Sequence, residues 1–462
     1  MPLWLCQWDA CRQPAVQRAG DCMLCDRHLC RTHLQRPWHE CPEPEENWES
    51  YSAQYAATES RHIDELCHRI DGTNLCARAS MLRGGVPCTV QLSRRNLSAM
   101  MGNQNCHVEI TFQDNVRWLA RFRLTRTSSP PREVRDYILR SEAATMIYLQ
   151  QHTRIPTPRI FDWACESDPR NSLGAGYILM EKLDGKPLDW NGATPDQRER
   201  VMQQLVDVFL EIERHPFDAM GSLVSAGDAA EFEVQGLARH ATFRMGCGGP
   251  LGPFTSSQEC SRAILESYLE MIASGEIEAC YPVDVYLAHR FRLDIVQDLF
   301  PSGGQFFLKH PDDKGDHILV NDSFDIVGLI DWEWMQTVSR ADAFCSPCMM
   351  WPLAEFYNGS NDLATDEMRL ADIFRERGRE DLAKCVIDGR KIQRFFFALG
   401  PDSSFLDRKT SIALFSGLRR AFGSGDEGWE QWKGNALEKW KSDESLRRLL
   451  ELEESRETQV VT

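Results

Sequence analysis

The stretch that decides the fold is FFLKHPDDKGDHILVNDSFDIVGLIDWEW, residues 306–334. Two short apolar runs, HILV and FDIVGLI, flank a polar turn, which is typical of a β-hairpin. Asp312 lies shortly before the first run, and Asp331 directly follows the second. A carboxylate beside a buried strand is costly unless it is paired or holds a metal. Two carboxylates on adjacent tight loops suit phosphoryl transfer, in which one accepts a proton and the other binds magnesium.

The same segment resembles a known family. HPDDKGDH (310–317) resembles the catalytic loop of the kinase superfamily, which reads His-x-Asp, four residues, then Asn. IDWE (330–333) resembles the metal-binding motif of the aminoglycoside phosphotransferase and choline kinase branch, and the text beyond it resembles a group found mostly in fungi. The resemblance covers about residues 90–400. It implies an α+β, bilobal protein-kinase-like fold with a small β-rich N-lobe and a larger helical C-lobe.

The resemblance also implies roles for single residues. Asp312 matches the catalytic base, Asp331 matches the metal ligand, and Lys314 is placed to reach the transferred phosphate. His317 departs from the pattern, because the family has Asn there. Magnesium prefers oxygen ligands to imidazole. Three outcomes stay open: Asp331 binds the metal with water and Asp316, manganese is favoured, or the site binds nucleotide weakly and catalyses little.

Upstream, VEITF (108–112) and VRWLARFRL (116–124) alternate with period two around the turn signal QDN, which predicts a strand hairpin. The alternation places Arg121 and Arg123 on the face opposite Trp118 and Phe122. By resemblance, Arg121 takes the place of the phosphate-binding strand lysine, with Arg123 as the alternative. An arginine can bind a phosphate through two parallel hydrogen bonds.

A helix is expected from about residue 133 to 151, and Glu142 falls on its apolar stripe. The resemblance implies that Glu142 pairs with the strand cation; the alternative is a solvated position at the edge of the stripe. Gly102, in MMGNQNC, lies where the phosphate-covering loop belongs, although an ordinary turn explains it equally well. Glu181 and Lys182 end an apolar strand and should form the adenine-binding hinge through backbone groups.

The first 41 residues contain a ladder of metal-binding side chains. It reads Cys6-x4-Cys11-x10-Cys22-x2-Cys25-x4-Cys30-x2-His33-x5-His39-x-Cys41. Eight thiolate and imidazole ligands suit two tetrahedral zinc sites, and so short a segment needs metal to fold. The ladder resembles the stress-associated-protein (A-N-one) type of zinc finger. Carried over from that family, Cys6, Cys11, Cys30 and His33 hold one structural zinc, and Cys22, Cys25, His39 and Cys41 hold the other.

We expect five segments in the chain. They are a two-zinc finger (1–45), a linker with a helical extension (46–89), the N-lobe (90–183), a mainly helical C-lobe interrupted by residues 306–334 (184–424), and a charged helical tail (425–462). The formal charge of −17 disfavours nucleic-acid binding and would suit a cationic small molecule, although the simpler interpretation is that it keeps the protein soluble. We predict neither a membrane span nor a signal peptide, and therefore a cytoplasmic or nuclear location.

Two hypotheses follow. The first is an ATP-dependent phosphotransferase that uses magnesium or manganese and transfers the γ-phosphate to a hydroxyl of an unknown small molecule. The second is a catalytically weak pseudokinase scaffold, recruited to a protein partner through its zinc finger. His317 is the residue on which the choice depends.

Overall fold

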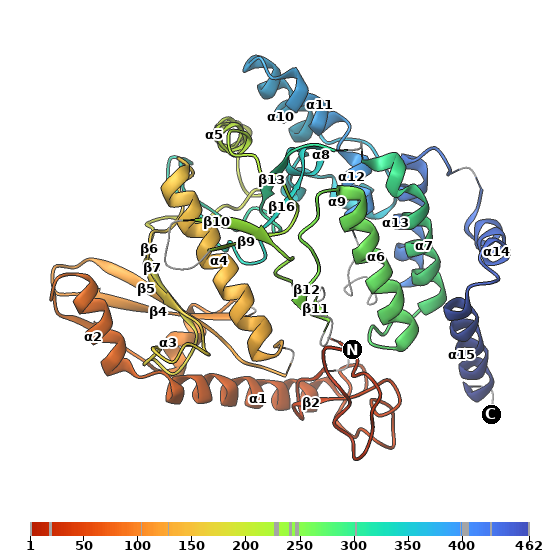
Figure 1. Ribbon diagram of the computed structural model, residues 1–462, viewed down its shortest axis with the longest axis horizontal. Coiled ribbons are helices and arrows are strands. Elements are labelled where there is room, and N and C mark those ends of the chain that lie inside the picture. The colour runs from red at the N-terminus through yellow and green to blue at the C-terminus, as the bar shows by residue number, and fades with distance from the viewer. Residues whose placement is uncertain are drawn as a thin grey trace.

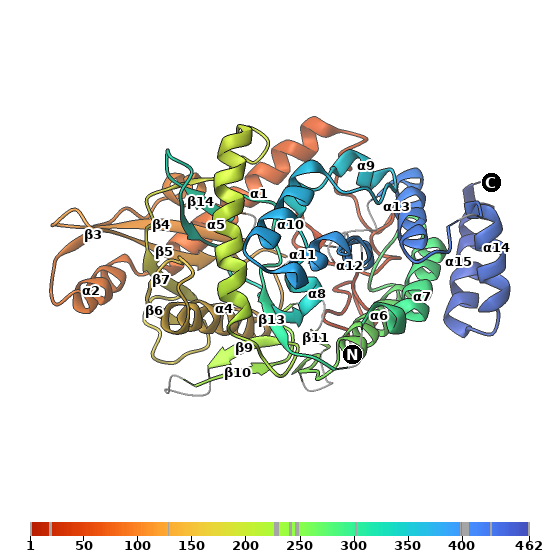
Figure 2. The same ribbon diagram turned by 90° about the horizontal axis from the view of Figure 1, so that it is seen from above.

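The computed structural model describes residues 2–17, 21–102, 104–127, 129–225, 231–239, 243–244, 249–300, 303–397, 399, 406–425 and 427–460. A β-rich lobe and a helical lobe lie side by side, with the N-terminal finger beneath both (Figure 1). The view from above separates the same two lobes (Figure 2). None of the described helices is both long enough and apolar enough to cross a membrane.

A five-stranded antiparallel sheet of order β3-β4-β5-β7-β6 forms the smaller lobe. Its strands are β3 (Cys88–Val90), β4 (Asn105–Phe112), β5 (Arg117–Arg123), β6 (Ile160–Ala164) and β7 (Tyr177–Glu181). The predicted hairpin is the β4–β5 pair, in which Thr111 lies opposite Arg117. Asn115 in its turn has φ 65°, a left-handed conformation that asparagine tolerates better than most residues.

Helices cover this sheet. They are α1 (Trp48–Arg69), α2 (Gly72–Leu82), α3 (Arg94–Ala99) and α4 (Arg132–His152). Trp118, Ala120 and Phe122 of β5 lie in a buried core that also contains residues of α1 and α2. Arg121, one position out of phase with them, contacts α4 on the other face, as the alternation predicts.

The larger lobe is built mostly from helices. They are α5 (Pro195–Glu213), α6 (Ser257–Ser274), α7 (Pro282–Leu299), α8 (Arg340–Ala343), α9 (Leu353–Tyr357), α10 (Thr365–Glu376), α11 (Glu380–Ile387), α12 (Arg390–Phe396), α13 (Arg408–Ala421), α14 (Trp429–Lys439) and α15 (Glu444–Val460). One apolar core joins α4, α5, α10 and α11 to the strands near residues 306–338. A second core joins α6 and α7 to α12–α15.

Residues 306–339 form two small sheets within the helical lobe. Their strands are β13 (Phe306–Lys309), β14 (Ile318–Val320), β15 (Ile326–Leu329) and β16 (Gln336–Ser339), and β14 also pairs with β8 (Lys186–Pro187). The hairpin expected in this segment is the β14–β15 pair, in which Ile318 lies opposite Leu329. The predicted α+β class and the two-lobed, kinase-like arrangement are confirmed.

Residues 306–334, the interruption of the helical lobe expected from the sequence, are joined by further strands among the described residues. Four more strands precede them: β9 (Ser222–Ser225), β10 (Phe232–Gln235), β11 (Phe243–Arg244) and β12 (Gly249–Pro250). The chain can enter this layer because Gly221 has no side chain: a Cβ there would lie 1.9 Å from the Gln235 carbonyl oxygen. Its backbone forms a bridge with Thr337, beside β16.

The finger contains the short hairpin β1 (Asp21–Cys22) and β2 (Arg27–His28), and it contacts both lobes. On the helical-lobe side, Gln17 Nε2 donates to Glu276 Oε1 at 2.9 Å, and the Gln17 backbone donates to the Glu276 carbonyl at 2.7 Å. On the other side, Thr127 Oγ1 donates to Asp26 Oδ1 at 2.6 Å, just before α4. His62 of α1 lies 3.1 Å from the same carboxylate. The finger is therefore part of the folded body.

Candidate active site and metal-ligand clusters

The two loops predicted to carry chemistry meet at one end of the β14–β15 hairpin. The Ile330 backbone donates to the His317 carbonyl at 2.9 Å. His310 joins the loops through both ring nitrogens: Nδ1 accepts from the Asp312 backbone at 3.2 Å, and Nε2 lies 3.0 Å from the Ile330 carbonyl. Burial lowers the pKa of His310, so the ring is neutral near pH 7 and can donate from Nε2 while it accepts at Nδ1. His310 thus fixes the two loops relative to each other.

Asp312 lies at the solvent-facing end of this loop, with 42% of its side chain exposed. Lys314 Nζ lies 2.7 Å from Asp312 Oδ2 and 3.3 Å from Asp316 Oδ2. The hydrogen bond that Lys314 donates to Asp312 raises the pKa of Lys314, which therefore remains charged at neutral pH. The loop thus presents the carboxylates of Asp312 and Asp316 to solvent on either side of the Lys314 cation.

Asp331 occupies a strained backbone position, with φ 61°. Its side chain is accessible to solvent, yet the surrounding protein desolvates the carboxylate enough to raise its pKa, against the opposing effect of Arg121. Asp312 and Glu333 also contribute to the increase. An accessible, partly desolvated carboxylate is a suitable ligand for a hard divalent cation.

Arg121 is shared between two buried carboxylates. It pairs with Glu142 of α4, and its Nη2 lies 2.8 Å from Glu333 Oε2. Both acids are at least 97% buried, so Glu142 is not solvated at the edge of its helix. Burial raises the pKa of Glu142, and Arg121 opposes that shift. The structure therefore brings the predicted strand cation and the predicted helix carboxylate together.

Glu333 is the residue that the sequence analysis missed. It accepts from Arg121, from Arg123 and from Asn105 Nδ2, the last at 2.8 Å. Burial disfavours its charge, but the two guanidinium groups outweigh burial and lower its pKa. The available signal was an acid between two tryptophans in an apolar segment, two residues after Asp331. Arg121 and Arg123 of β5 are therefore both paired with buried carboxylates.

His317 occupies the position at which the family has Asn. Its ring stacks on His310 with a centroid separation of 4.2 Å, and only 7% of the residue is exposed. Among the described residues its buried Nδ1 has no hydrogen-bond partner. Burial, with the nearby His310 and Lys314, lowers the pKa of His317 well below its ordinary value, so the ring is neutral. A neutral imidazole nitrogen is free to accept here.

The remaining predicted nucleotide-site residues lie around the sheet. Gly102 is in the turn between α3 and β4, where its backbone donates to the Asn105 carbonyl at 2.9 Å. The Glu181 backbone donates to the Arg159 carbonyl at 2.8 Å, so this N–H is already used within the sheet. Lys182, the first residue after β7, pairs with Glu109. A hinge contact to adenine would therefore come from the backbone at or beyond residue 182.

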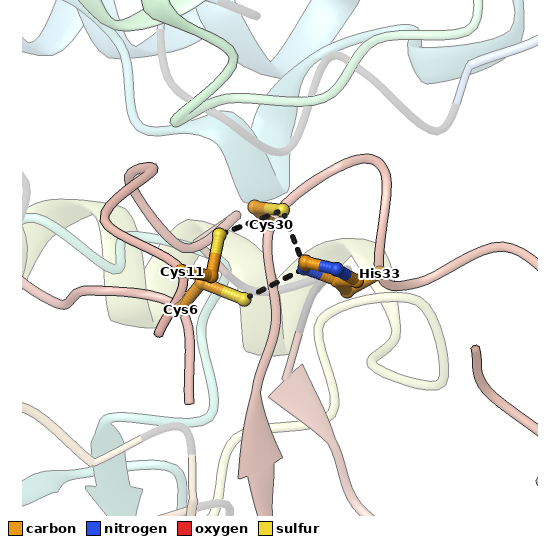
Figure 3. Close-up of side chains that lie close together, drawn as sticks. All are labelled: Cys6, Cys11, Cys30 and His33. Carbon is orange, nitrogen blue, oxygen red and sulfur yellow. Dashed lines mark hydrogen bonds between the residues drawn. The ribbon is translucent and has the colours of Figure 1, made fainter. Parts of the chain in front are cut away.

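The N-terminal ladder folds into two separate groups of four ligands. They are Cys6, Cys11, Cys30 and His33 in one group, and Cys22, Cys25, His39 and Cys41 in the other. Figure 3 shows the first group, in which Cys6 Sγ and Cys30 Sγ each lie 3.3 Å from His33 Nδ1. Within each group the ligand atoms lie within 4.8 Å of one another. Ligands on a tetrahedral zinc ion at about 2.3 Å would lie roughly 3.8 Å apart, so both groups could bind zinc.

Among the described residues, these two groups are the only clusters of three or more His, Cys, Asp or Glu ligands drawn together in this way. Asp331 does not belong to such a cluster. A divalent cation at Asp331 would therefore depend on water and on the phosphates of a bound nucleotide for its other ligands, as magnesium commonly does.

No family model matches the chain. Two subtelomeric hrmA-associated cluster proteins, from Aspergillus fumigatus strains Af293 and CEA10, are each 33% identical to it over 107 residues. The match covers 23% of this chain and 21% of each relative. The chain thus spans about a fifth of the length of the curated relatives it matches.

Several solved structures resemble the chain at low identity. A candidate fructosamine-3-kinase from Thermobifida fusca is 18% identical, with a TM-score of 0.45 over 75% of this chain and 98% of that one. A thermostable mutant of aminoglycoside phosphotransferase APH(4)-Ia is 15% identical, with a TM-score of 0.41 over 76% and 100%. A type I macrolide 2'-phosphotransferase is 15% identical, with a TM-score of 0.39 over 78% and 99%. The fold assignment itself rests on the topology of this chain.

Proposed function

We propose that the chain is an ATP-dependent phosphotransferase that transfers the γ-phosphate to a hydroxyl of a small molecule. The observation that carries the proposal is the junction at His310, which fixes the Asp312 loop against the strand that leads to Asp331. The acceptor oxygen forms a bond to the γ-phosphorus, the bond from that phosphorus to the β,γ-bridging oxygen breaks, and ADP leaves. Asp312 takes the proton of the acceptor hydroxyl, and Lys314 contacts the transferred phosphoryl group.

Asp331 would hold the divalent cation, which neutralises phosphate charge when bound. The buried acids neutralise Arg121 and Arg123, so the sheet offers the phosphates little uncompensated positive charge. Nucleotide binding should therefore require the metal. If His317 supplies an imidazole ligand to the cation, manganese should be favoured over magnesium, because imidazole suits the softer ion better.

The test is a thermal-shift and turnover assay of the full chain with ATP or GTP and either magnesium or manganese. We expect metal-dependent nucleotide binding that Asp331→Ala abolishes, and slow nucleotide hydrolysis that Asp312→Ala abolishes while binding is retained. His317→Asn should increase the response to magnesium relative to manganese. If no nucleotide binds with either metal, and none binds to His317→Asn, the proposal is wrong.

A catalytically weak scaffold is the second candidate, and Glu333 is the observation that favours it. Because Glu333 pairs with both Arg121 and Arg123, neither arginine can contact a phosphate unless that pairing changes. In this case the finger would recruit a protein partner. Turnover that is lost in Asp312→Ala would argue against the scaffold, and nucleotide binding without turnover would favour it.

For the finger, we propose two structural zinc ions, one in each group of four ligands. Metal analysis of the purified chain should find two zinc ions per molecule. Cys6→Ser and Cys22→Ser should each lose one ion, because each removes a ligand from a different group. A single shared ion would contradict the proposal. We place the protein in the cytoplasm or nucleus, where thiolates stay reduced and available to zinc.

A further inference from the structure

A cavity lies in the helical lobe, between α7, α13 and α14, which stand at the side of the molecule away from the sheet (Figure 1). It encloses about 640 Å³ with its open mouth included, and it is narrow. None of its lining residues belongs to segment 306–334 or to the Arg121 cluster. It is lined mainly by apolar and aromatic side chains, among them Tyr281, Val285, Ala288, Leu414, Phe415 and Trp429.

Arg292 is a buried cation in the wall of this cavity. Only 6% of the residue is exposed. Its Nε and Nη2 each donate to a backbone carbonyl, of Phe395 and Phe397, at 2.9 Å, and Nη1 lies 3.3 Å from His289 Nδ1. No carboxylate among the described residues pairs with it, and burial lowers its pKa to about 10. It therefore stays charged at pH 7 without an anionic partner, which is costly in a protein interior.

The contacts of Arg292 with the end of α12 explain part of this arrangement, because a cation there stabilises the helix terminus. Arg394 is a buried arginine that contacts the end of a helix in the same way but does not line this cavity. It is also buried and donates to the Phe356 carbonyl at 2.9 Å, but its guanidinium packs against the Phe356 ring, 3.6 Å from the centroid, and it lines no part of the cavity. What distinguishes Arg292 is the empty apolar space beside its charge.

Two further observations favour an anionic ligand. Asp284 is the acid in the cavity wall, and its charge is already offset by Lys433 at 2.5 Å and Arg408 at 3.3 Å. The wall therefore retains a net positive charge. Trp429 also lines the cavity, and its Nε1 is shielded from solvent without a hydrogen-bond partner among the described residues. A buried donor without an acceptor is uncommon in native proteins.

We propose that this cavity binds a small apolar carboxylate, whose carboxylate accepts hydrogen bonds from Arg292 and whose linear or flat apolar body lies against the aromatic wall. The combination of a narrow apolar space with one buried cation matches the usual design of small-molecule sites, in which a few polar groups orient a mostly apolar ligand. The site is separate from the proposed phosphotransferase centre, and it does not depend on that activity.

The test uses octanoate and benzoate as probes of the full-length protein, with octanol and octylamine as controls of similar length. Calorimetry and thermal unfolding should show binding of octanoate or benzoate, and neither control should bind comparably. Arg292→Gln should weaken carboxylate binding roughly tenfold or more, because it removes a charge-assisted hydrogen bond. Arg394→Gln is the matched control: it removes a buried arginine outside the cavity, so probe affinity should stay unchanged.

Arg292→Gln also removes contacts to α12, so loss of binding in this variant could reflect misfolding. A second variant therefore tests the cavity with Arg292 in place. Ala288→Leu adds side-chain volume to the cavity wall and leaves Arg292 in place; it should abolish binding of the carboxylates. Any of three results would overturn the proposal: neither carboxylate binds the wild type, octanol binds as tightly as octanoate, or both variants bind octanoate like the wild type.

Discussion

Glu333, in the loop between β15 and β16, contacts strands β4 and β5, which lie about two hundred residues earlier in the chain. Its carboxylate accepts hydrogen bonds from Arg121 and Arg123 of β5 and from the side chain of Asn105, and these contacts lie in the protein interior. Removing one partner of a buried ion pair leaves the other charges uncompensated, and this costs more than the pair itself contributes.

We predict that Glu333→Gln lowers the free energy of unfolding by about 3–5 kcal/mol. Glutamine has the same shape as glutamate but no charge, so the positive charges of Arg121 and Arg123 are no longer fully compensated. Urea unfolding followed by circular dichroism would measure the loss. Glu109→Gln is the matched control, because Glu109 and Lys182 are both partly exposed, at 30% and 26%, and the change should stay under about 1 kcal/mol. Equal losses in the two variants would contradict the account of Glu333.

His289 makes stability depend on pH. Burial, followed by the charge of Arg292, lowers its pKa well below the ordinary value of about 6.5. The folded state therefore excludes a proton that the unfolded chain binds below pH 6.5. Its contribution is fully present above that pH and is lost as the pH falls, by up to about 1.4 kcal/mol per pH unit.

We therefore expect His289→Gln to flatten the pH dependence of unfolding by about one proton between pH 6.5 and 5. Glutamine can still accept from Arg292 but does not titrate. Free energies of unfolding in urea at pH 8, 6.5, 5.5 and 5 would show this. The slopes of wild type and variant should coincide above pH 7, and identical slopes at pH 5–6.5 would exclude the assignment.

At the scale of elements, the chain can enter the layer beside β16 because of one glycine. The Gly221 backbone donates to Thr337 Oγ1 at 3.0 Å and accepts from the Thr337 backbone at 2.8 Å. A side chain at Gly221 would meet both Gln235 and Val234 of β10. The β9–β10 hairpin and β16 therefore depend on this close approach.

We predict that Gly221→Ala destabilises the protein by about 3 kcal/mol, at the upper end of overpacking substitutions. Gly434→Ala is the contrasting control, since Gly434 lies within α14 and a Cβ there meets no atom within 4 Å. That change should stabilise the protein by about 0.5–1 kcal/mol. The midpoints of thermal and urea unfolding should shift in opposite directions in the two variants. If Gly221→Ala leaves both midpoints unchanged, the packing argument is wrong.

The sequence predicted those elements that have a strong local signal. Alternation located β5, and the turn around Asn115 located the β4–β5 hairpin. The division of the finger ligands into two groups came from the resemblance to a zinc-finger family, and the same two groups form in the structure. The strands β9–β12 were not predicted, because they have only two to four residues each and so short a run shows no clear alternation. Glu333 escaped for a different reason: its importance comes from partners on β5 and on β4, and a local pattern does not show such long-range contacts.

At the scale of the whole molecule, the finger contacts the two lobes through separate residues. Gln17 and Leu3 both donate to Glu276 beyond α6, while Asp26 accepts from Thr127 before α4. Gln17 and Leu3 are at least 96% buried, so these contacts are interior ones. If zinc stabilises the finger, its removal should also lower the stability of both lobes.

We predict that removing zinc with a chelator lowers the unfolding temperature of the entire chain and reduces hydrogen-exchange protection at the end of α6. Cys385→Ser, which changes a thiol outside both ligand groups, should respond to the chelator like the wild type. Gln17→Ala should retain any bound zinc but lose part of the stability, because it removes one side-chain docking contact to Glu276 and leaves the metal ligands in place. A chelated protein that is metal-free yet unfolds at the original temperature would refute the coupling.

The Gln17–Glu276 contact also has a consequence for synthesis on the ribosome. The two residues are 259 positions apart in the chain. At roughly 5–20 residues per second, the ribosome needs about 13–50 s to deliver the second after the first. For most of that interval, once Cys41 has been added, the nascent finger has all its candidate metal ligands but no docking surface for Leu3 and Gln17. If the finger binds zinc, it can therefore do so before the helical lobe has been synthesised.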